Sequence, residues 1–258
     1  MDSPVYHTTA KSKYHEKNED SCFIGDGFVV VADGMGGESC GDIASKIAVE
    51  TTARMLADSC EEAAGGDMEL LFSAVYAADR NISGYADEHP EAMGMGTTML
   101  IMTHRNRRIS LAWCGDSRAY VYRDGRLHSL TKDHSYVQQL IDDGKISVDE
   151  SFTHPDNNLI TRFVGGGEET CIPEYTTCEA DDSDIIILCS DGLSGYCRDK
   201  DIEREIATNQ DISTLPARLK ELAARHGSDD DITIVVLSAG GRNAGHRHFA
   251  LFDWFRKV

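Results

Sequence analysis

The sequence predicts an α+β fold in which two antiparallel sheets are packed between helices. Short apolar runs occur in pairs separated by turn residues, a pattern typical of β-hairpins. Two long segments with helical spacing of apolar residues follow one another at 41–58 and 67–88, and strand-like runs then return. This block order lacks regular strand–helix alternation, which argues against a doubly wound parallel sheet.

The first hairpin is predicted from the apolar runs 21–25 and 28–32, which are joined by Asp26-Gly27. An Asp-Gly pair between two such runs indicates a tight turn. A second antiparallel block is predicted at 96–104, 108–116 and 118–125, with a helix at 133–145 and a polar excursion at 147–170. The last elements are strands at 184–190 and 232–238 and helices at 199–208 and 213–226.

Composition limits the class of protein. The 258 residues are 41% hydrophobic and 27% charged, which is typical of a globular chain. No apolar run approaches the roughly 20 residues of a membrane helix, and the N-terminal stretch lacks a signal-peptide pattern. Eight cysteines without a CxxC pair indicate free thiols in a reducing compartment. We therefore expect a cytoplasmic protein.

The formal net charge of −19 disfavours nucleic acid as a partner, because such a surface repels phosphates. It raises the question of whether some of the acids converge on cations. Solubility is the simpler explanation of the charge. The positions of the aspartates along the chain decide between solubility and cation binding.

Aspartates recur at the ends of the predicted strands. Asp20 lies just before one strand and Asp33 just after the next, so an antiparallel hairpin places both at one sheet edge. Asp116 and Asp191 each follow an apolar strand, and Asp230 precedes the last strand. Each of them alone fits a turn or a solvated acid. Together they predict a rim of carboxylates, which would repel one another strongly without cations.

Oxygen ligands without a histidine or cysteine set point to Mg²⁺ or Mn²⁺ rather than Zn²⁺. Two such ions about 3.5–4 Å apart can share a carboxylate and hold a nucleophilic water. Gly34 fits this interpretation, since a residue without a side chain lets its carbonyl approach a metal closely.

Eight stretches stand out along the chain: NED (18–20), VADGMGG (31–37), GMGTT (94–98), CGDSRAYVYRDGRL (114–127), LTKDHSYVQQLIDDGKI (130–146), NLITRFVGGG (158–167), LCSDGL (188–193) and DDDIT (229–233). In this order and spacing they resemble the metal-dependent protein phosphatases of type 2C, and the DGMGG form of the second stretch resembles the bacterial branch of that family. The resemblance covers residues 12–238.

The resemblance implies a four-layer α-β-β-α sandwich with a metal centre at one edge of the sheets. It implies a phosphatase catalytic domain over 1–239 and a flap at about 135–170 beside the site. It also implies metal roles, with Asp33 bridging two ions, Gly34 ligating one through its carbonyl, Asp191 and Asp230 holding the other, Glu19 and Asp20 orienting bound waters, and Asp116 at a third, weaker position.

The implied activity is hydrolysis of phosphoserine and phosphothreonine in proteins by a water held between two Mn²⁺ or Mg²⁺ ions. Phosphoryl transfer needs positioning and charge neutralisation more than a side-chain nucleophile. The partners implied are phosphorylated proteins and a serine/threonine kinase whose action is reversed, and we expect a monomer.

Some positions depart from the family pattern. His15 occupies the place of an arginine that grips the substrate phosphate, and an imidazole cannot reproduce the bidentate fork. Met35 stands where other branches carry a histidine, so His15 is also a candidate for the acid that serves the leaving group. Gly195 replaces an aspartate, which weakens a third ion, and Asp231 replaces a commoner asparagine.

The segment 240–258 is a basic, aromatic tail with a charge opposite to that of the body. One interpretation is docking to a protein or a membrane surface, and the other is a terminal segment that packs on the acidic domain. For the whole chain, two other functions stay open, namely a metal-binding pseudophosphatase that regulates phosphoproteins and a two-metal nuclease.

Overall fold

The computed structural model describes residues 4–36, 40–58, 67–105, 107–208 and 211–240. The tail predicted to dock or pack, from residue 241 onward, lies outside the described residues, and so does Gly37 of the glycine-rich stretch.

Two antiparallel sheets form the centre of the molecule. The first has the order β1 (Val5–Ala10), β11 (Ile232–Ser238), β10 (Ile185–Cys189), β7 (Arg118–Arg123) and β8 (Arg126–Ser129). The second has the order β2 (Asp20–Gly25), β3 (Phe28–Met35), β5 (Met99–Arg105), β6 (Arg108–Cys114) and β9 (Glu174–Glu179), with β4 (Gly96–Thr97) paired to β3. The predicted antiparallel pairing is confirmed.

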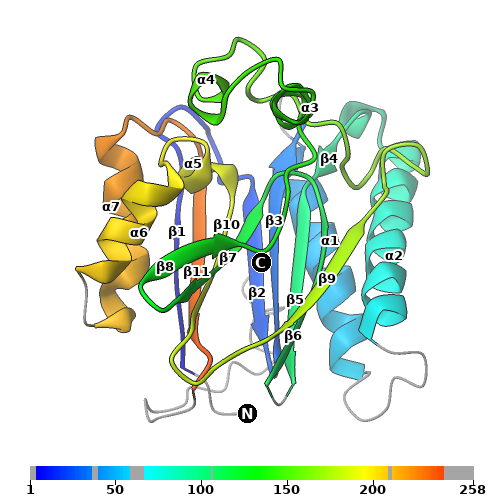
Figure 1. Cartoon of the computed structure of the whole chain (residues 1–258). Helices are drawn as coiled ribbons and strands as arrows, with labels where there is room; N and C mark the ends of the chain where they lie inside the picture. The colour runs from blue at the N-terminus through cyan, green and yellow to red at the C-terminus, as the bar shows by residue number, and fades with distance from the viewer. Residues whose placement is uncertain (1–3, 37–39, 59–66, 106, 209–210, 241–258) are drawn as a thin grey trace.

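Helices cover the outer face of each sheet, which gives four layers (Figure 1). Helices α1 (Gly41–Asp58) and α2 (Asp67–Glu88) lie on the second sheet, and α6 (Asp199–Ala207) and α7 (Leu215–Arg225) lie on the first. Short 3₁₀ turns stand before β4 (Pro90–Ala92) and before α7 (Ile212–Thr214). The α-β-β-α sandwich expected from the sequence is confirmed.

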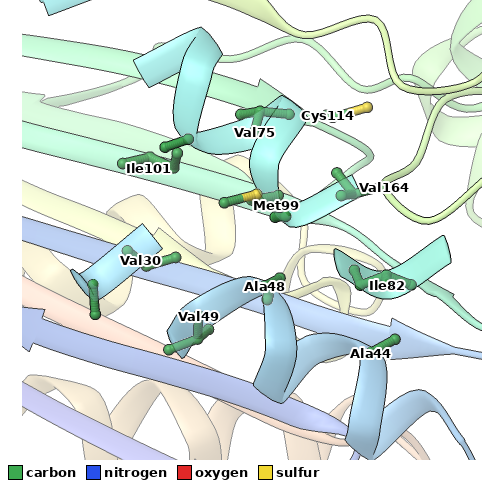
Figure 2. Close-up of a cluster of buried hydrophobic side chains, with 14 of the residues drawn as sticks. Val30, Ala44, Ala48, Val49, Val75, Ile82, Met99, Ile101, Cys114 and Val164 are labelled. Carbon is green, nitrogen blue, oxygen red and sulfur yellow. The ribbon is translucent and has the colours of Figure 1, made fainter. Parts of the chain in front are cut away.

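Alternation along β3 explains how one strand serves two cores. Val30 and Ala32 face α1 and α2, whereas Val29 and Val31 face the other sheet. Figure 2 shows the helical side of this arrangement, where Ala44 and Ala48 of α1 bring the helix close to the sheet near Val30. A strand buried on both faces reads as the continuous apolar run seen in the sequence.

Several predicted boundaries were wrong. Strand β3 continues through Asp33 to Met35, because pairing with β4 extends its ladder beyond the apolar run. The helix predicted at 133–145 is only Tyr136–Asp142, and Gly144 beyond it has φ 68°. Three strands were not predicted at all, β1, β8 and β9, because they lie at sheet edges and are only partly buried.

The excursion predicted at 135–170 lies over one end of both sheets. Figure 1 shows its helices α3 (Tyr136–Asp142) and α4 (Val148–Ser151) above the strand ends, near β3 and β10. One isolated bridge, Thr97 to Val164, anchors the excursion to β4, and a second, Ser135 to Ile160, joins two parts of the excursion itself. The bridge to β4 ties the excursion to the strand that pairs with β3 at Gly34 and Met35.

The described cysteines are all free thiols, as the sequence predicted. Within the described residues, no helix combines the length and apolar character that crossing a membrane requires.

A buried ion pair joins β7 to the turn before β10. Asp184 is fully buried, and its carboxylate accepts hydrogen bonds from Arg123 and from the backbone N–H of Asp181 at 2.8 Å. Burial alone would raise the pKa of Asp184, but the hydrogen bonds from Arg123 and Asp181 outweigh it and hold the pKa below its usual value. The pair thus stabilises the fold with Asp184 ionised.

We expect Arg123→Met to lower the free energy of unfolding by about 2–3 kcal/mol, because it leaves a buried carboxylate without its cation. Solvent screening at the partly exposed Arg123 keeps the loss near the lower end of the range for buried pairs. Because the folded-state pKa of Asp184 is depressed, the stabilisation exists above pH 3.8 and is lost as the pH falls below it. Urea unfolding at pH 7 and pH 3 measures the loss of stability and its dependence on pH. Arg107→Met, at an exposed pair with Asp181, is the matched control and should change stability by less than about 0.5 kcal/mol.

Candidate metal centre

Asp20 and Asp33 face one another across the first hairpin. The register of β2 and β3 pairs Asp20 with Asp33 as direct neighbours, as the Asp26-Gly27 turn predicted. The backbone of Asp33 is held on its other side, where its N–H donates to Thr98 Oγ1 at 2.9 Å and its carbonyl accepts from Thr97 Oγ1 at 2.8 Å. The position of Asp33 is therefore set by β2, by Thr97 of β4 and by Thr98, which lies between β4 and β5.

Asp191 comes to the same place from the first sheet. Strand β10 ends at Cys189, Ser190 caps the short helix α5 (Asp191–Ser194), and Asp191 is its first residue. Ser190 joins the sheets, because its hydroxyl donates to Asp20 Oδ2 at 2.8 Å and accepts from the N–H of Thr233 at 2.9 Å. The aspartates of both sheets are thus connected through one buried serine.

Asp230 and Asp231 precede β11 and complete the rim. The carboxylate of Asp231 accepts from the backbone N–H groups of Ser12 at 2.6 Å and Glu19 at 2.7 Å. Its buried side chain therefore fixes the segment that carries Glu19 against the start of β11. This anchoring role was missed at the sequence level, where only the replacement of an asparagine drew attention to Asp231.

The rim opens into a pocket of about 400 Å³. One wall carries acids, and the opposite wall belongs to the excursion. The acidic wall consists of Glu19, Asp33, Asp191, Asp230 and Asp231, and the facing wall of Asn158, Leu159, Ile160 and Phe163. His15, Gly34, Met35 and Gly36 line the remainder. Asp20 and Asp116 are buried beside this pocket rather than on its wall.

The carboxylates lie close enough to raise one another's pKa. Burial, with the charges of Asp20 and Asp191, raises the pKa of Asp33 well above its usual value. Burial, followed by the charge of Asp230, raises the pKa of Asp191 to about 6. Burial likewise raises the pKa of Asp20 to about 7 despite its bond from Ser190. Such a set of carboxyl groups can be fully ionised only with a cation nearby.

Unsatisfied oxygen atoms test whether the residues suit a metal. Among the described residues, the buried atoms Asp20 Oδ1, Asp116 Oδ1 and Asp191 Oδ1 have no hydrogen-bond partner. Buried acceptors without donors are rare, because each one costs desolvation free energy. Within the same part of the chain, no group of three or more histidine, cysteine, aspartate or glutamate side chains is arranged so that it could hold a metal ion. The acids that line the pocket nevertheless offer hard oxygen donors, the type of ligand that suits Mg²⁺ or Mn²⁺.

Gly34 and Gly192 permit close backbone contacts at the rim. A Cβ on Gly34 would lie 2.0 Å from the carbonyl oxygen of Gly41 and 2.7 Å from that of Glu19. A Cβ on Gly192 would lie 1.9 Å from the carbonyl oxygen of Asp231. The absence of side chains at these positions lets α1, α5 and the segment before β11 pack against the acids.

Asp116 follows β6 in the loop that leads to β7. Burial and the charge of Asp191 raise its pKa well above the usual value, which places it next to the acidic set. Gly195, where an aspartate was expected, ends α5 and donates its N–H to the carbonyl of Asp191. Asp116 and Asp191 are thus the described acids that could serve a third ion.

His15 lies on the pocket wall with its Nδ1 3.0 Å from Asp231 Oδ2. Its side chain is 37% exposed, so the structure places it at the site rather than on a remote surface. Met35 also lines the pocket but carries no proton donor. The sequence predicted a flap at about 135–170 beside the site, but it did not predict which of its residues, such as Phe163, line the pocket.

Comparison with protein families matches residues 10–230 of the chain to the model described as Protein phosphatase 2C. Among curated proteins, the serine/threonine protein phosphatase PstP of Mycobacterium tuberculosis is 38% identical over 220 residues, which cover 85% of this chain. The chain spans only 41% of the length of that relative. The serine/threonine phosphatase stp of Listeria monocytogenes is 29% identical, with 92% of this chain and 97% of the relative covered.

Solved structures agree with the fold. A structure of the Mycobacterium tuberculosis phosphatase PstP/Ppp aligns with a TM-score of 0.82 and 35% identity, over 92% of this chain and 98% of the other. A structure of the PstP catalytic domain in complex with two manganese ions aligns with a TM-score of 0.82 and 34% identity, over 92% of this chain and 97% of the other.

Proposed function

This chain belongs to the protein phosphatase 2C family, and from that membership we propose that it hydrolyses phosphoserine and phosphothreonine in proteins with two Mn²⁺ or Mg²⁺ ions. The observation that supports this most directly is that three acids, Asp33, Asp191 and Asp230, line one pocket. Burial and the charges of its acidic neighbours raise the pKa of Asp33 there. The relatives are named as serine/threonine phosphatases, and one homologous structure holds two manganese ions.

Asp33 would bridge the two ions, with the carbonyl of Gly34 on one of them and Asp191 and Asp230 on the other. When bound, the ions supply the positive charge that activates water and neutralises the phosphate. Glu19 and Asp20 would orient bound waters, and Asp116 with Asp191 would hold a weaker third ion. Strand β3, the end of β10 and the start of β11 place Asp33, Asp191 and Asp230 at the same end of the sandwich.

The wall from the excursion would contact the substrate beside the phosphoserine or phosphothreonine. Leu159 is 51% exposed, and the less exposed Phe163 lines the same pocket, so the wall offers an apolar surface beside the acids. Such a wall accepts a protein segment extended across the pocket. We further propose a monomeric, cytoplasmic signalling enzyme of bacterial type, with one catalytic domain over 1–239, that opposes a serine/threonine kinase.

Two alternatives carry less support. A pseudophosphatase would not need the full set of Asp33, Asp191 and Asp230, and the relatives are named as phosphatases. A nuclease would need a surface that attracts phosphate backbones, whereas this chain carries a net charge of −19. Docking of the tail from residue 241 to membranes or proteins stays a proposal. Deleting residues 241–258 would test it.

We expect Mn²⁺ to be required for hydrolysis of both p-nitrophenyl phosphate and a phosphothreonine peptide. The carboxylates alone repel a phosphate, so chelation by EDTA should reduce both rates to the background, and added Mn²⁺ should restore them. Phosphate release measured against a Mn²⁺ titration checks this. Manganese binding without turnover of either substrate would indicate the pseudophosphatase, and cleavage of DNA would indicate the nuclease.

A further inference from the structure

The segment between β1 and β2 is fastened to one buried carboxylate. Asp231, whose side chain is 2% exposed, accepts from Ser12 N–H on Oδ1 and from Glu19 N–H on Oδ2. The ammonium group of Lys11 adds a tie by donating to the carbonyl of His15 at 2.6 Å. His15 stands between these fastened ends, so its backbone has little freedom.

The same carboxylate determines which nitrogen of His15 carries a hydrogen. Both oxygens of Asp231 already accept from backbone N–H groups, and Oδ2 also lies 3.0 Å from His15 Nδ1. Because a carboxylate can only accept, the hydrogen of this contact must belong to Nδ1. In the described part of the chain, Asp231 is the side chain hydrogen-bonded to the ring, and its partner atom is Nδ1, which leaves Nε2 available at the pocket.

The surroundings favour the doubly protonated ring. The hydrogen bond that His15 donates to Asp231 raises the pKa of His15, partial burial opposes it, and the charge of Asp231 adds to the increase. On its own segment, Lys11 is engaged by the carbonyls of His15 and Glu16. A cationic imidazole with Nδ1 occupied presents one N–H donor, Nε2–H.

We propose that Asp231 positions His15 so that Nε2–H protonates the departing serine or threonine oxygen, an inference that rests on the phosphatase activity proposed above. Water forms the new P–O bond while the bond from phosphorus to the substrate oxygen breaks. The electron pair of the broken bond takes the proton of Nε2, and a neutral hydroxyl leaves. The imidazole regains a proton from solvent, so no oxidant or further reactant is needed.

The two departures from the family pattern then form a single unit. An arginine at position 15 would grip phosphate through two parallel N–H groups and would not release a proton. An asparagine at position 231 has one acceptor oxygen and an NH₂ group, which would oppose one of the N–H donors that Asp231 now accepts. Histidine at 15 and aspartate at 231 match one another as proton donor and positioning residue.

The leaving group distinguishes this role from phosphate binding. Nitrophenolate departs without a proton, whereas a serine or threonine alkoxide is a poor leaving group. For His15→Gln we expect kcat on a phosphothreonine peptide to fall by about 100-fold, at the lower end of the range for a general acid. We expect kcat on p-nitrophenyl phosphate to change by less than about threefold. His7→Gln, on the exposed middle of β1, is the matched control and should leave both rates unchanged.

Asp231→Asn gives a second readout. We expect the Nδ1–H signal of His15 in ¹⁵N NMR to disappear, the peptide rate to fall, and the double variant with His15→Gln to be no slower than the single His15→Gln. Calorimetric Mn²⁺ titration of each variant identifies any loss that arises at the neighbouring Asp230.

Equal losses on both substrates, or a rise of KM on both with kcat unchanged, would overturn the proposal in favour of phosphate binding or a structural role. No loss on either substrate would also overturn it. A wild-type protein that hydrolyses neither substrate would instead refute the proposed function, so the two failures are distinguishable.

Discussion

Asp33→Asn is expected to abolish phosphatase activity without unfolding the protein. Asp33 lines the pocket with Asp191 and Asp230 and lies directly opposite Asp20 in the hairpin. An amide keeps the shape of the side chain but removes the charge that two cations would share. The loss of this charge costs several kcal/mol of transition-state stabilisation. We therefore expect kcat to fall by about 10³-fold.

The same substitution separates metal binding from folding. Ligand binding stabilises the wild type by about 2.7 kcal/mol at a Mn²⁺ concentration 100 times the dissociation constant. We expect this increase in melting temperature to vanish in Asp33→Asn. The metal-free variant should melt at the temperature of the metal-free wild type or above it, because one repelling acid is gone. Asp26→Asn in the turn at the other end of the hairpin is the control. Retained Mn²⁺ stabilisation in Asp33→Asn would contradict the assignment of Asp33 as the bridging ligand.

Gly34→Ala is expected to produce a large loss of stability at the rim, about 3 kcal/mol. Its Cβ would meet the carbonyl oxygens of Gly41 and Glu19, and backbone atoms cannot swing aside as a flexible side chain can. Because Gly34 N–H also donates to the Glu19 carbonyl at 3.1 Å, a shift of β3 would displace Glu19 and Asp33 together. We expect a loss of activity of about 100-fold, since misplacement by 1 Å can cost that much.

Gly84→Ala is the matched control, because a Cβ at this exposed position in α2 meets nothing within 4 Å. Alanine is favoured over glycine inside a helix, so this variant should gain about 1 kcal/mol. Urea unfolding of both variants measures the contrast. A Gly34→Ala protein as stable and as active as the wild type would show that the close contact at the rim is not required.

The local pattern was sufficient for most of the fold. Helical spacing predicted α1 and α2, and Asp26-Gly27 predicted the hairpin that makes Asp20 and Asp33 neighbours. Edge strands such as β9 escaped prediction, because their stability comes from pairing with a neighbour rather than from apolar alternation. The same reason explains why β3 continues past Asp33, where β4 supplies the missing partner.

The family resemblance, the layered architecture and the acids at the strand ends could be predicted, because they depend on residue types and on spacing along the chain. The hydrogen bonds of Ser190 to Asp20 and of Asp231 to the segment that carries His15 became known from the folded structure. Such contacts join residues up to 219 positions apart. The partner of a buried polar group is chosen by how the sheets pack, and no local pattern records that choice.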